Sequence, residues 1–386
     1  MTPAPIPYGK QFIDVDDIAA VVATLKSGLI TQGPAIDRFE RAMAEFCGAK
    51  HAVAVSNATA ALHIGALALG LQAGDRLWTS PNTFVASSNC ALYCGAAVDF
   101  VDIDPRTHNM SVDALRTKLE AAAKNGTLPK IIVPVDFAGQ SCEMAEIRAL
   151  ADQHGCKVME DASHAVGGEY QGQKVGVCHH ADLTIFSFHP VKIMTTGEGG
   201  MLLTNDDELH QKLLRLRSHG ITRDPRFIQN PPDGPWSYEQ IDLGFNFRLT
   251  DLQAALGESQ LKKLPQFLQR RRELAARYDY KLAGLPLTRP WQHPDTVSAW
   301  HLYVVHVPAE KRLAVFQGLR AAGIYAQIHY IPVHTQPWYQ TLGFKTGDYP
   351  VAESHYASAI SLPMYYGLTD ADQDRVVDAL KDLLPS

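Results

Sequence analysis

The chain has 386 residues, of which 46% are hydrophobic, and a formal net charge of −6 at pH 7. A single hydrophobic core seldom organises so long a chain, so we expect two domains. The acidic balance argues against a nucleic-acid-binding surface, which needs clustered Lys and Arg. The six cysteines are scattered without CxxC pairs, which predicts reduced thiols and neither a disulfide framework nor a metal site.

No targeting or membrane segment is recognisable in the sequence. The first five residues lack the basic and apolar regions of a signal peptide. No apolar stretch approaches the roughly 18 residues of a membrane span. We therefore expect a soluble, cytoplasmic protein that contacts neither a membrane nor nucleic acid.

The first half of the chain reads as alternating helices and strands. Two apolar helical stripes, over residues 14–25 and 36–46, precede a buried strand at 51–56, and a polar turn then leads into a helix that ends near residue 71. The alternation that follows is typical of βαβ units and predicts a mostly parallel sheet covered by helices on both faces. The further expected strands are 76–80, 97–102, 130–137, 157–161, 183–188 and 201–204, and the helices are 83–94, 111–125, 143–154 and 206–218.

The second half changes pattern. Residues 222–246 lack periodicity and predict a long functional or mobile loop. A long helical region, from about 250 to 282 with an interruption at Pro265, leads into a smaller α+β unit. Its expected elements are strands at 301–307 and 325–330 and helices at 311–322 and 369–384. We predict a large domain over residues 1–250 and a smaller one over 251–386, with the boundary at the long helix. The arginines at 270–272 are expected on solvated faces with local ion pairs.

Four groups of polar or aromatic side chains follow strands of the predicted sheet. They are the turn at 57–59, Thr83 with Phe84, Asp161 with His164, and Ser187 with Lys192. Because the carboxyl ends of parallel strands share one edge, we expect these side chains to converge on one crevice.

Lys192 gives this set a specific chemical meaning. A lysine amine, a carboxylate, an aromatic ring, and hydroxyls beside a helix N-terminus are together what pyridoxal phosphate needs for its Schiff base, its pyridine nitrogen, its ring and its phosphate. Each group alone has an ordinary explanation: Lys192 as a surface lysine, Asp161 as a helix cap and Phe84 as core. Their joint placement favours the cofactor.

Several motifs resemble a known family. They are SFHPVK at 187–192, GEGG at 197–200, EDASHA at 160–165, PNTF at 81–84 and GFNFRL at 244–249. With them the sequence resembles the DegT/DnrJ/EryC1/StrS sugar aminotransferases, from about Tyr8 to the last helix. The resemblance implies the fold-type-I aminotransferase architecture, a large α/β domain with a smaller α+β C-terminal domain, and pyridoxal 5'-phosphate as cofactor.

The resemblance also implies roles for individual residues. Lys192 would form the Schiff base and Asp161 would pair with the pyridine nitrogen, so these two are the expected catalytic residues. The expected cofactor-binding residues are these two with Phe84, His164, Ala58, Thr59, Ser187 and Asn246, and the expected substrate-binding residues are Tyr8, Thr31, His329 and Tyr330. Asn246 would come from a neighbouring subunit, which implies a homodimer with shared active sites. Position 84 carries Phe where many relatives have Trp or Tyr, and position 164 carries His where many have Gln.

Within the family, the resemblance is to members of the pseudaminic acid pathway. It implies transfer of an amino group from glutamate to a UDP-4-keto-6-deoxy-N-acetylhexosamine. One alternative is a 4- or 3-aminotransferase for a different nucleotide keto-sugar. Another is a cofactor-binding regulatory protein without catalysis, although the chain has neither the spare length nor the basic charge for a DNA-binding domain. Family members that dehydrate have His at the lysine position, so Lys192 favours transamination.

Overall fold

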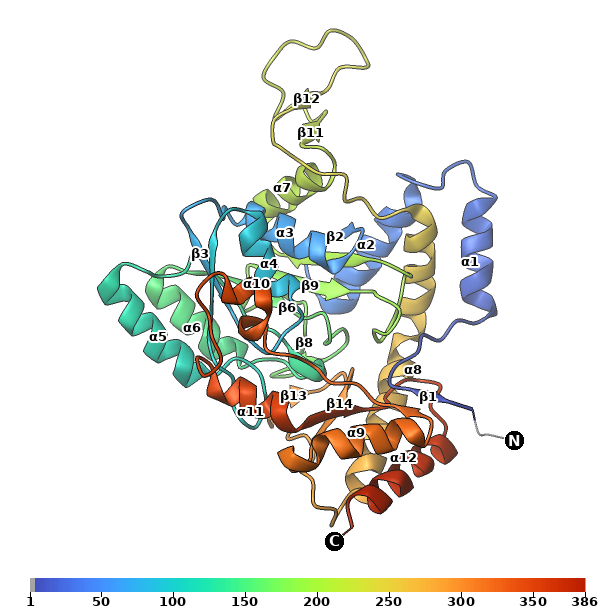
Figure 1. The fold of residues 1–386 in the computed structure, drawn as a ribbon. Coiled ribbons are helices and arrows are strands. Elements are labelled where there is room, and N and C mark those ends of the chain that lie inside the picture. Colours follow the sequence, from blue (N-terminus) through green and yellow to red (C-terminus); the bar gives the residue numbers. More distant parts are fainter. Residues whose placement is uncertain (1–3, 386) are drawn as a thin grey trace.

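A seven-stranded sheet forms the centre of the larger part of the molecule, in the computed structural model that describes residues 4–385 (Figure 1). β10 runs antiparallel to both of its neighbours, β2 and β9, while the other six strands share one direction. The predicted α/β class with a mostly parallel sheet is therefore confirmed. In spatial order the strands are β2 (His51–Val55), β10 (Gly200–Thr204), β9 (Leu183–Ser187), β6 (Lys157–Asp161), β5 (Ile131–Val133), β3 (Arg76–Thr79) and β4 (Ala97–Phe100).

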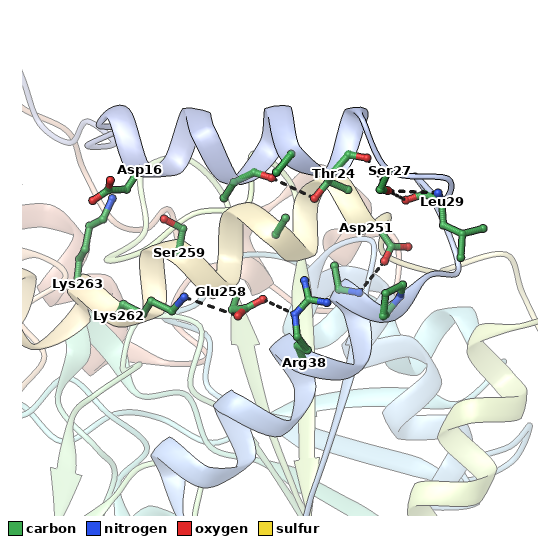
Figure 2. Close-up of a pocket in the computed structure, with 15 residues that line it drawn as sticks. Asp16, Thr24, Ser27, Leu29, Arg38, Asp251, Glu258, Ser259, Lys262 and Lys263 are labelled. Carbon is green, nitrogen blue, oxygen red and sulfur yellow. Dashed lines mark hydrogen bonds and ion pairs between the residues drawn. The ribbon is translucent and has the colours of Figure 1, made fainter.

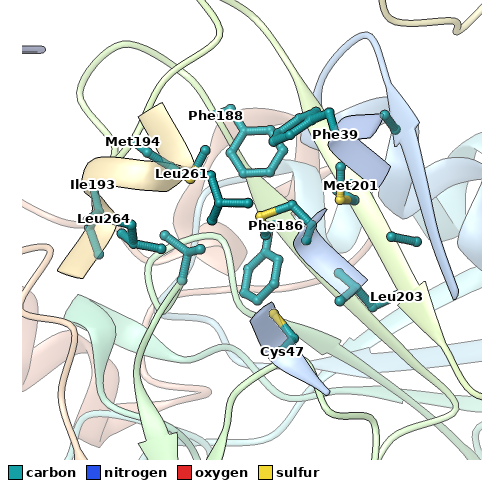
Figure 3. Packing of buried hydrophobic residues seen from close by; sticks show 14 of the residues in the cluster. Phe39, Cys47, Phe186, Phe188, Ile193, Met194, Met201, Leu203, Leu261 and Leu264 are labelled. Atoms are coloured by element: carbon teal, nitrogen blue, oxygen red, sulfur yellow. The ribbon is translucent and has the colours of Figure 1, made fainter. Parts of the chain in front are cut away.

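Helices cover both faces of this sheet. Because successive side chains of a strand point to opposite faces, β10 supplies Met201 and Leu203 to one apolar cluster and Leu202 to the other. Figure 3 shows the first cluster, where Phe39 and Phe186 lie close to Met201. The covering helices are α2 (Pro34–Cys47), α3 (Ala58–Ala68), α4 (Ala86–Tyr93), α5 (Val112–Asn125), α6 (Met144–His154) and α7 (Asp207–Arg217).

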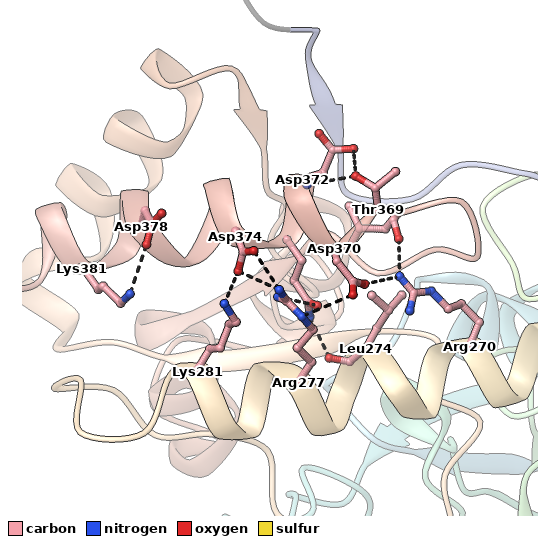
Figure 4. Close-up of polar contacts among 12 residues, drawn as sticks. Arg270, Leu274, Arg277, Lys281, Thr369, Asp370, Asp372, Asp374, Asp378 and Lys381 are labelled. Atoms are coloured by element: carbon pink, nitrogen blue, oxygen red, sulfur yellow. Dashed lines mark hydrogen bonds and ion pairs between the residues drawn. The ribbon is translucent and has the colours of Figure 1, made fainter.

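α8 (Asp251–Lys281) joins the two parts of the molecule as one continuous helix. The predicted interruption at Pro265 is wrong, because packing along the whole helix offsets the lost N–H bond and the ring clash of an interior proline, which together cost about 3 kcal/mol. α1 (Val15–Leu25) and α2 pack against its first half, and ion pairs with α12 (Asp370–Leu383) hold its second half. Figure 4 shows these pairs, among them Arg277 with Asp374.

The three consecutive arginines of α8 have different environments. Arg270 forms an ion pair with Asp370, as expected for a solvated face. Arg271 is only 2% exposed and donates to the backbone carbonyls of Trp300 and Met364, so the expectation of solvation is wrong for this residue. The reason is that α8 is covered from more than one side.

The smaller part contains the antiparallel pair β14 (Tyr303–His306) and β16 (Ala359–Leu362) with α9 (Arg312–Ala321), α11 (Pro350–Ser358) and α12. β15 (Ile324–Tyr325) pairs with the amino-terminal β1 (Ile6–Pro7) and is shorter than the predicted strand at 325–330. In the segment after it, His329 and Tyr330 line a cavity.

The domain division at residue 250 stays a prediction. The core side chains of α8 up to Leu268 belong to a cluster with the large sheet, whereas those from Leu274 onward belong to the cluster of the smaller part. Ile6 also belongs to the second cluster, so the amino-terminal strand packs with the carboxy-terminal elements.

Residues 222–246 are mostly loop, with the short hairpin of β11 (Ile221–Thr222) and β12 (Glu239–Gln240) projecting from the body (Figure 1). The remaining elements are β7 (Glu169–Tyr170), β8 (Gln173–Lys174), β13 (Thr296–Val297), α10 (Pro337–Gln340), and the 3₁₀ turns η1 (Phe137–Gly139), η2 (Ala309–Lys311) and η3 (Val333–Thr335). Over residues 4–385, no helix has the length and apolar character needed to cross a membrane.

Candidate active site

A cavity of about 740 Å³ opens at the edge where the parallel strands have their carboxyl ends. Side chains from the turns after β2, β3, β6 and β9 line it. The alternation of strands and helices in the sequence predicted that these turns lie at one edge of the sheet. The predicted residues that line it are Tyr8, Ala58, Thr59, Phe84, Asp161, His164, Ser187, Lys192, His329 and Tyr330.

Two of the predicted site residues do not line this cavity. Thr31 is exposed and lies beside Thr250 in an isolated antiparallel bridge. Asn246 is exposed and bridges to Ser218, while the next residue, Phe247, does line the cavity. Because successive side chains of an extended segment point to opposite sides, Asn246 faces away from the cavity of its own chain.

Asp161 is the last residue of β6 and is held firmly. The Ser87 hydroxyl donates to Oδ2 at 2.6 Å, and the Ser163 backbone N–H donates to Oδ1 at 3.1 Å. Thr83 lies on the other side of Ser87, with 2.7 Å between the two hydroxyl oxygens. These bonds orient the buried carboxylate before any ligand binds.

Lys192 follows β9 in a turn closed by its own backbone N–H, which donates to the carbonyl of His189 at 2.9 Å. Burial lowers the pKa of the amine from its usual 10.5 to about 8, and the nearby charge of Asp161 opposes this shift. An amine with this pKa is partly unprotonated near neutral pH, which is the form that attacks a carbonyl carbon.

The amino end of α3 points into the same cavity. Asn57 caps the helix by accepting the Ala60 N–H at 2.8 Å, so the ordinary capping role holds. The N–H groups of Ala58 and Thr59 belong to the first turn, where a helix offers no internal acceptors. Gly200 permits this placement, because a Cβ there would lie 2.5 Å from the carbonyl carbon of Asn57. The arrangement suits an anion such as a phosphate.

His164 and Tyr330 form a hydrogen-bonded pair in the cavity wall. Burial, with repulsion from Lys192, lowers the pKa of His164 well below its usual value, so its ring is neutral. The Ala138 N–H donates to its Nδ1 at 3.3 Å, so the single ring proton is on Nε2, which lies 3.1 Å from the Tyr330 hydroxyl oxygen. The Tyr330 hydroxyl proton is thereby left free to be donated into the cavity.

His329 is a second neutral histidine in this wall. Burial, again with repulsion from Lys192, lowers its pKa to about 3. Its Nδ1 lies 2.8 Å from the hydroxyl oxygen of Ser361 on β16. The two rings whose charge would repel Lys192 are therefore neutral, and Asp161 is the charged group that favours its protonated amine.

Sequence analysis missed several residues of the cavity. Ser87 holds Asp161 and is one helical turn after Thr83, so the four-residue spacing was a usable signal. Glu198 and Phe247 lie within the GEGG and GFNFRL motifs, and His63 is one helical turn after Thr59, so these three also had a usable signal. Tyr93 had none, because it reaches the cavity only through tertiary packing.

Relatives with this architecture are known. The chain is 41% identical over 386 residues to the spore coat polysaccharide biosynthesis protein SpsC of Bacillus subtilis, covering 98% of this chain and 97% of the relative. It is 39% identical over 386 residues, with the same coverage, to the UDP-4-amino-4,6-dideoxy-N-acetyl-beta-L-altrosamine transaminase of Campylobacter jejuni.

Solved structures share the whole fold. Helicobacter pylori PseC, an aminotransferase involved in the biosynthesis of pseudoaminic acid, superposes with a TM-score of 0.90 at 34% identity, covering 98% of this chain and 99% of that one. The putative sugar aminotransferase Spr1654 of Streptococcus pneumoniae has been solved in its PLP form, with a TM-score of 0.89, 29% identity and 98% coverage of both chains, and also in its PMP form.

A family model also matches nearly the entire chain, over residues 11–381. Its match agrees with the cavity geometry, in which an amine, a fixed carboxylate and an anion-binding helix end meet. The chain belongs to the DegT/DnrJ/EryC1/StrS aminotransferase family and is a pyridoxal-phosphate-dependent sugar aminotransferase.

Proposed function

We propose that this enzyme transfers the amino group of glutamate to C4 of a UDP-linked 4-keto-6-deoxy-N-acetylhexosamine, forming UDP-4-amino-4,6-dideoxy-N-acetyl-β-L-altrosamine. The observation that carries transamination is the meeting of Lys192 and Asp161 in one cavity at the sheet edge. The choice of substrate is supported by the transaminase and the pseudoaminic acid enzyme among the relatives.

The cavity fits pyridoxal phosphate by the chemistry of its donors. Asp161 would hold the pyridine nitrogen, because its orientation is already fixed by Ser87 and Ser163. The phosphate would bind at the amino end of α3 with Ala58 and Thr59, beside the Ser187 hydroxyl. Phe84 lines the cavity with 58% of its surface exposed, which leaves a ring face available for stacking. When bound, the cofactor supplies an electrophilic carbonyl carbon and a ring that accepts electrons.

Lys192 Nζ has two tasks in this proposal. It would hold the cofactor covalently at rest, and as a free amine it would act as a general base toward the proton on the donor Cα. It then delivers a proton as a general acid. Its lowered pKa, near 8, suits both directions because neither protonation state is strongly favoured near neutral pH.

The aromatic wall orients the sugar and restricts water. The Tyr330 hydroxyl can donate to a sugar oxygen because His164 already donates to the tyrosine oxygen. Tyr8 and His329 lie against each other, with ring centroids 5.4 Å apart, and both line the cavity.

The enzyme would act as a homodimer with shared sites. The projecting hairpin region carries large exposed side chains, Trp236 at 67% and Leu243 at 83%, of the kind that a partner subunit covers. Asn246 and Thr31 face away from the cavity of their own chain. In a dimer they would reach the phosphate and the sugar nucleotide of the neighbouring site.

Complementation tests the sharing of sites. Chains with Lys192→Ala and chains with Asn246→Ala would be mixed, unfolded and refolded together. Each mixed dimer then has one site that combines Lys192 with the intact Asn246 of the other chain, so activity should exceed that of either variant alone. Sharing would be contradicted if the co-refolded mixture were no more active than the two variants refolded separately. A fully active monomer in sedimentation would also contradict it.

A substrate panel tests the reaction itself. The holoenzyme would be incubated with glutamate and 4-keto or 3-keto sugars linked to UDP or dTDP, and the products identified by NMR. We expect preferential amination at C4 of the UDP-linked N-acetylated sugar. The second candidate, amination of a different nucleotide keto-sugar, is favoured by the 41% identity to a spore coat polysaccharide protein, and preferential turnover of another sugar would establish it.

A further inference from the structure

We propose that His108, His306 and His355 form a binding site for a divalent transition metal, with Zn²⁺ as the expected ion. One ring nitrogen of each histidine lies within 4.8 Å of the others. None of the three lines the cavity that contains Lys192. The site therefore lies outside that cavity, and the proposal does not depend on which sugar the enzyme uses.

Hydrogen bonding orients His355 as a metal ligand. Its Nε2 lies 3.1 Å from the backbone carbonyl oxygen of His329, which can only accept, so Nε2 carries the ring proton. Nδ1 therefore accepts the hydrogen bond from His306 Nε2 at 2.9 Å, so both nitrogens face the point where a metal ion would replace that shared proton. Metal-ligating histidines usually donate their other N–H to a carbonyl or carboxylate in this way.

The spacing of the three rings is close to that of a zinc site. Tetrahedral zinc with Zn–N distances of about 2.0–2.1 Å needs nitrogens roughly 3.3 Å apart, close to the 2.9 Å between His306 and His355. A small movement of His108, whose ring centroid lies 4.5 Å from each of the other two, completes the set.

His355 is buried, and an apolar environment favours the neutral imidazole that metal binding requires. Phe137 provides an apolar wall, with its ring centroid 5.4 Å from that of His355. Three imidazoles favour zinc, copper or nickel over magnesium or calcium, which prefer oxygen ligands.

The position of the site suggests a structural role. His108 lies between β4 and α5 of the larger part, whereas His306 is in β14 and His355 in α11 of the smaller part. A shared ion would tie the two parts together. It would also fix the carbonyl of His329, the residue before Tyr330 in the cavity wall.

Metal titration of the full-length, cofactor-loaded enzyme tests the site. After treatment with a chelator, we expect one Zn²⁺ to bind per chain, and one Co²⁺ to give the visible d–d bands of tetrahedral coordination. Zn²⁺ should also raise the melting temperature. The absence of a bound metal ion, or of these cobalt bands, would overturn the proposal.

His108→Asn is the informative variant. The backbone of His108 is left-handed, at φ 60°, and Asn tolerates that conformation, so the fold should be retained. We expect Zn²⁺ affinity to fall by more than about tenfold, because even the loss of an outer-shell contact to a ligand weakens metal sites by about 10–100-fold. The matched control is His179→Asn, at an exposed ring that stacks on His180, which should leave zinc binding unchanged.

His306→Asn provides a second test in case the first variant folds poorly, which circular dichroism of the metal-free proteins would reveal. Wild-type affinity in either folded histidine variant, or an equal loss in the His179→Asn control, would refute the assignment. Because metal content, cobalt spectrum and melting temperature do not depend on turnover, these outcomes are distinct from a failure of the proposed sugar specificity.

Discussion

Two cavities of similar size show different chemistry. The first, of about 740 Å³, contains Lys192 and Asp161, and the second, of about 550 Å³, lies between α1, α2 and α8 (Figure 2). In the second, Arg38 and Lys262 both pair with Glu258. Its charges already neutralise one another, so volume alone does not identify a functional site.

The two helix N-termini at these cavities differ in the same way. Asp251 accepts the N–H groups of Gly33 and Ala35 at the amino end of α2 and thereby blocks it for any other anion. At α3, Asn57 accepts only the Ala60 N–H and leaves the first turn open to the cavity. An anionic ligand can therefore bind at the amino end of α3, whereas the amino end of α2 is already occupied by the carboxylate of Asp251.

The lysines complete the contrast. The pKa of Lys263 at the second cavity is raised, because its bonds with Asp14 and Asp17 outweigh the opposing effect of burial. The pKa of Lys192 is lowered because burial outweighs the attraction of Asp161. A buried lysine without a close ion-pair partner has a lowered pKa and a more reactive amine, whereas a lysine in an ion pair contributes to the stability of the fold.

The largest difference between the cavities should appear in their lysines. We expect Lys192→Ala to lower kcat by at least about 10⁴-fold and to abolish the absorbance of the covalently bound cofactor, because the variant lacks both the amine and the proton carrier. Lys262→Ala in the second cavity should retain both. Turnover and visible spectra of dialysed protein measure the effect. An unchanged spectrum in Lys192→Ala would show that Lys192 is not the residue that binds the cofactor covalently.

The two aspartates should separate catalysis from stability. Asp161→Asn is expected to lower kcat by about 10²-fold or more, because the charge on the pyridine nitrogen is lost. Asp251→Ala should leave kcat nearly unchanged and lower the free energy of unfolding by about 1–3 kcal/mol, because two N–H groups lose their acceptor. Steady-state kinetics and denaturant unfolding of both variants measure these effects. A large loss of kcat in Asp251→Ala with little change in Asp161→Asn would show that this division of roles is wrong.

Cofactor loading should depend on pH through Lys192. Its pKa near 8 means that the reactive unprotonated amine increases as pH rises. We expect the rate of recombination of the cofactor-free enzyme with pyridoxal phosphate to rise about tenfold between pH 7 and pH 9. Stopped-flow absorbance measures this rate. A midpoint near the ordinary value of 10.5 would mean that burial does not act on this amine.

Phe84 should give the smallest of these effects. Loss of its ring in Phe84→Ala is expected to weaken cofactor retention about threefold to tenfold, the range of one aromatic stacking contact. Phe84→Trp should restore retention, because a larger ring still stacks. Equilibrium dialysis of the cofactor checks both variants, and full retention in Phe84→Ala would exclude the ring as a stacking partner.

Much of the cavity could be predicted from the order of elements along the chain. Asp161 and Ser187 end apolar strands and Lys192 follows one, and parallel strands bring their carboxyl ends to one edge. Local patterns also predicted most helices and strands of the larger part, because alternation and capping depend on neighbouring residues.

The remainder depended on contacts between distant residues. The continuity of α8 through Pro265 and the burial of Arg271 follow from elements packed around that helix, which no local pattern records. Likewise, His108 meets His306 and His355 across about 200 and 250 residues of chain only because the two parts of the fold meet there. The sequence by itself determined the element types and the chemistry at the strand ends. Only the tertiary structure decided which charges are paired and which groups are left free to react, because burial and pairing are set by neighbours in space.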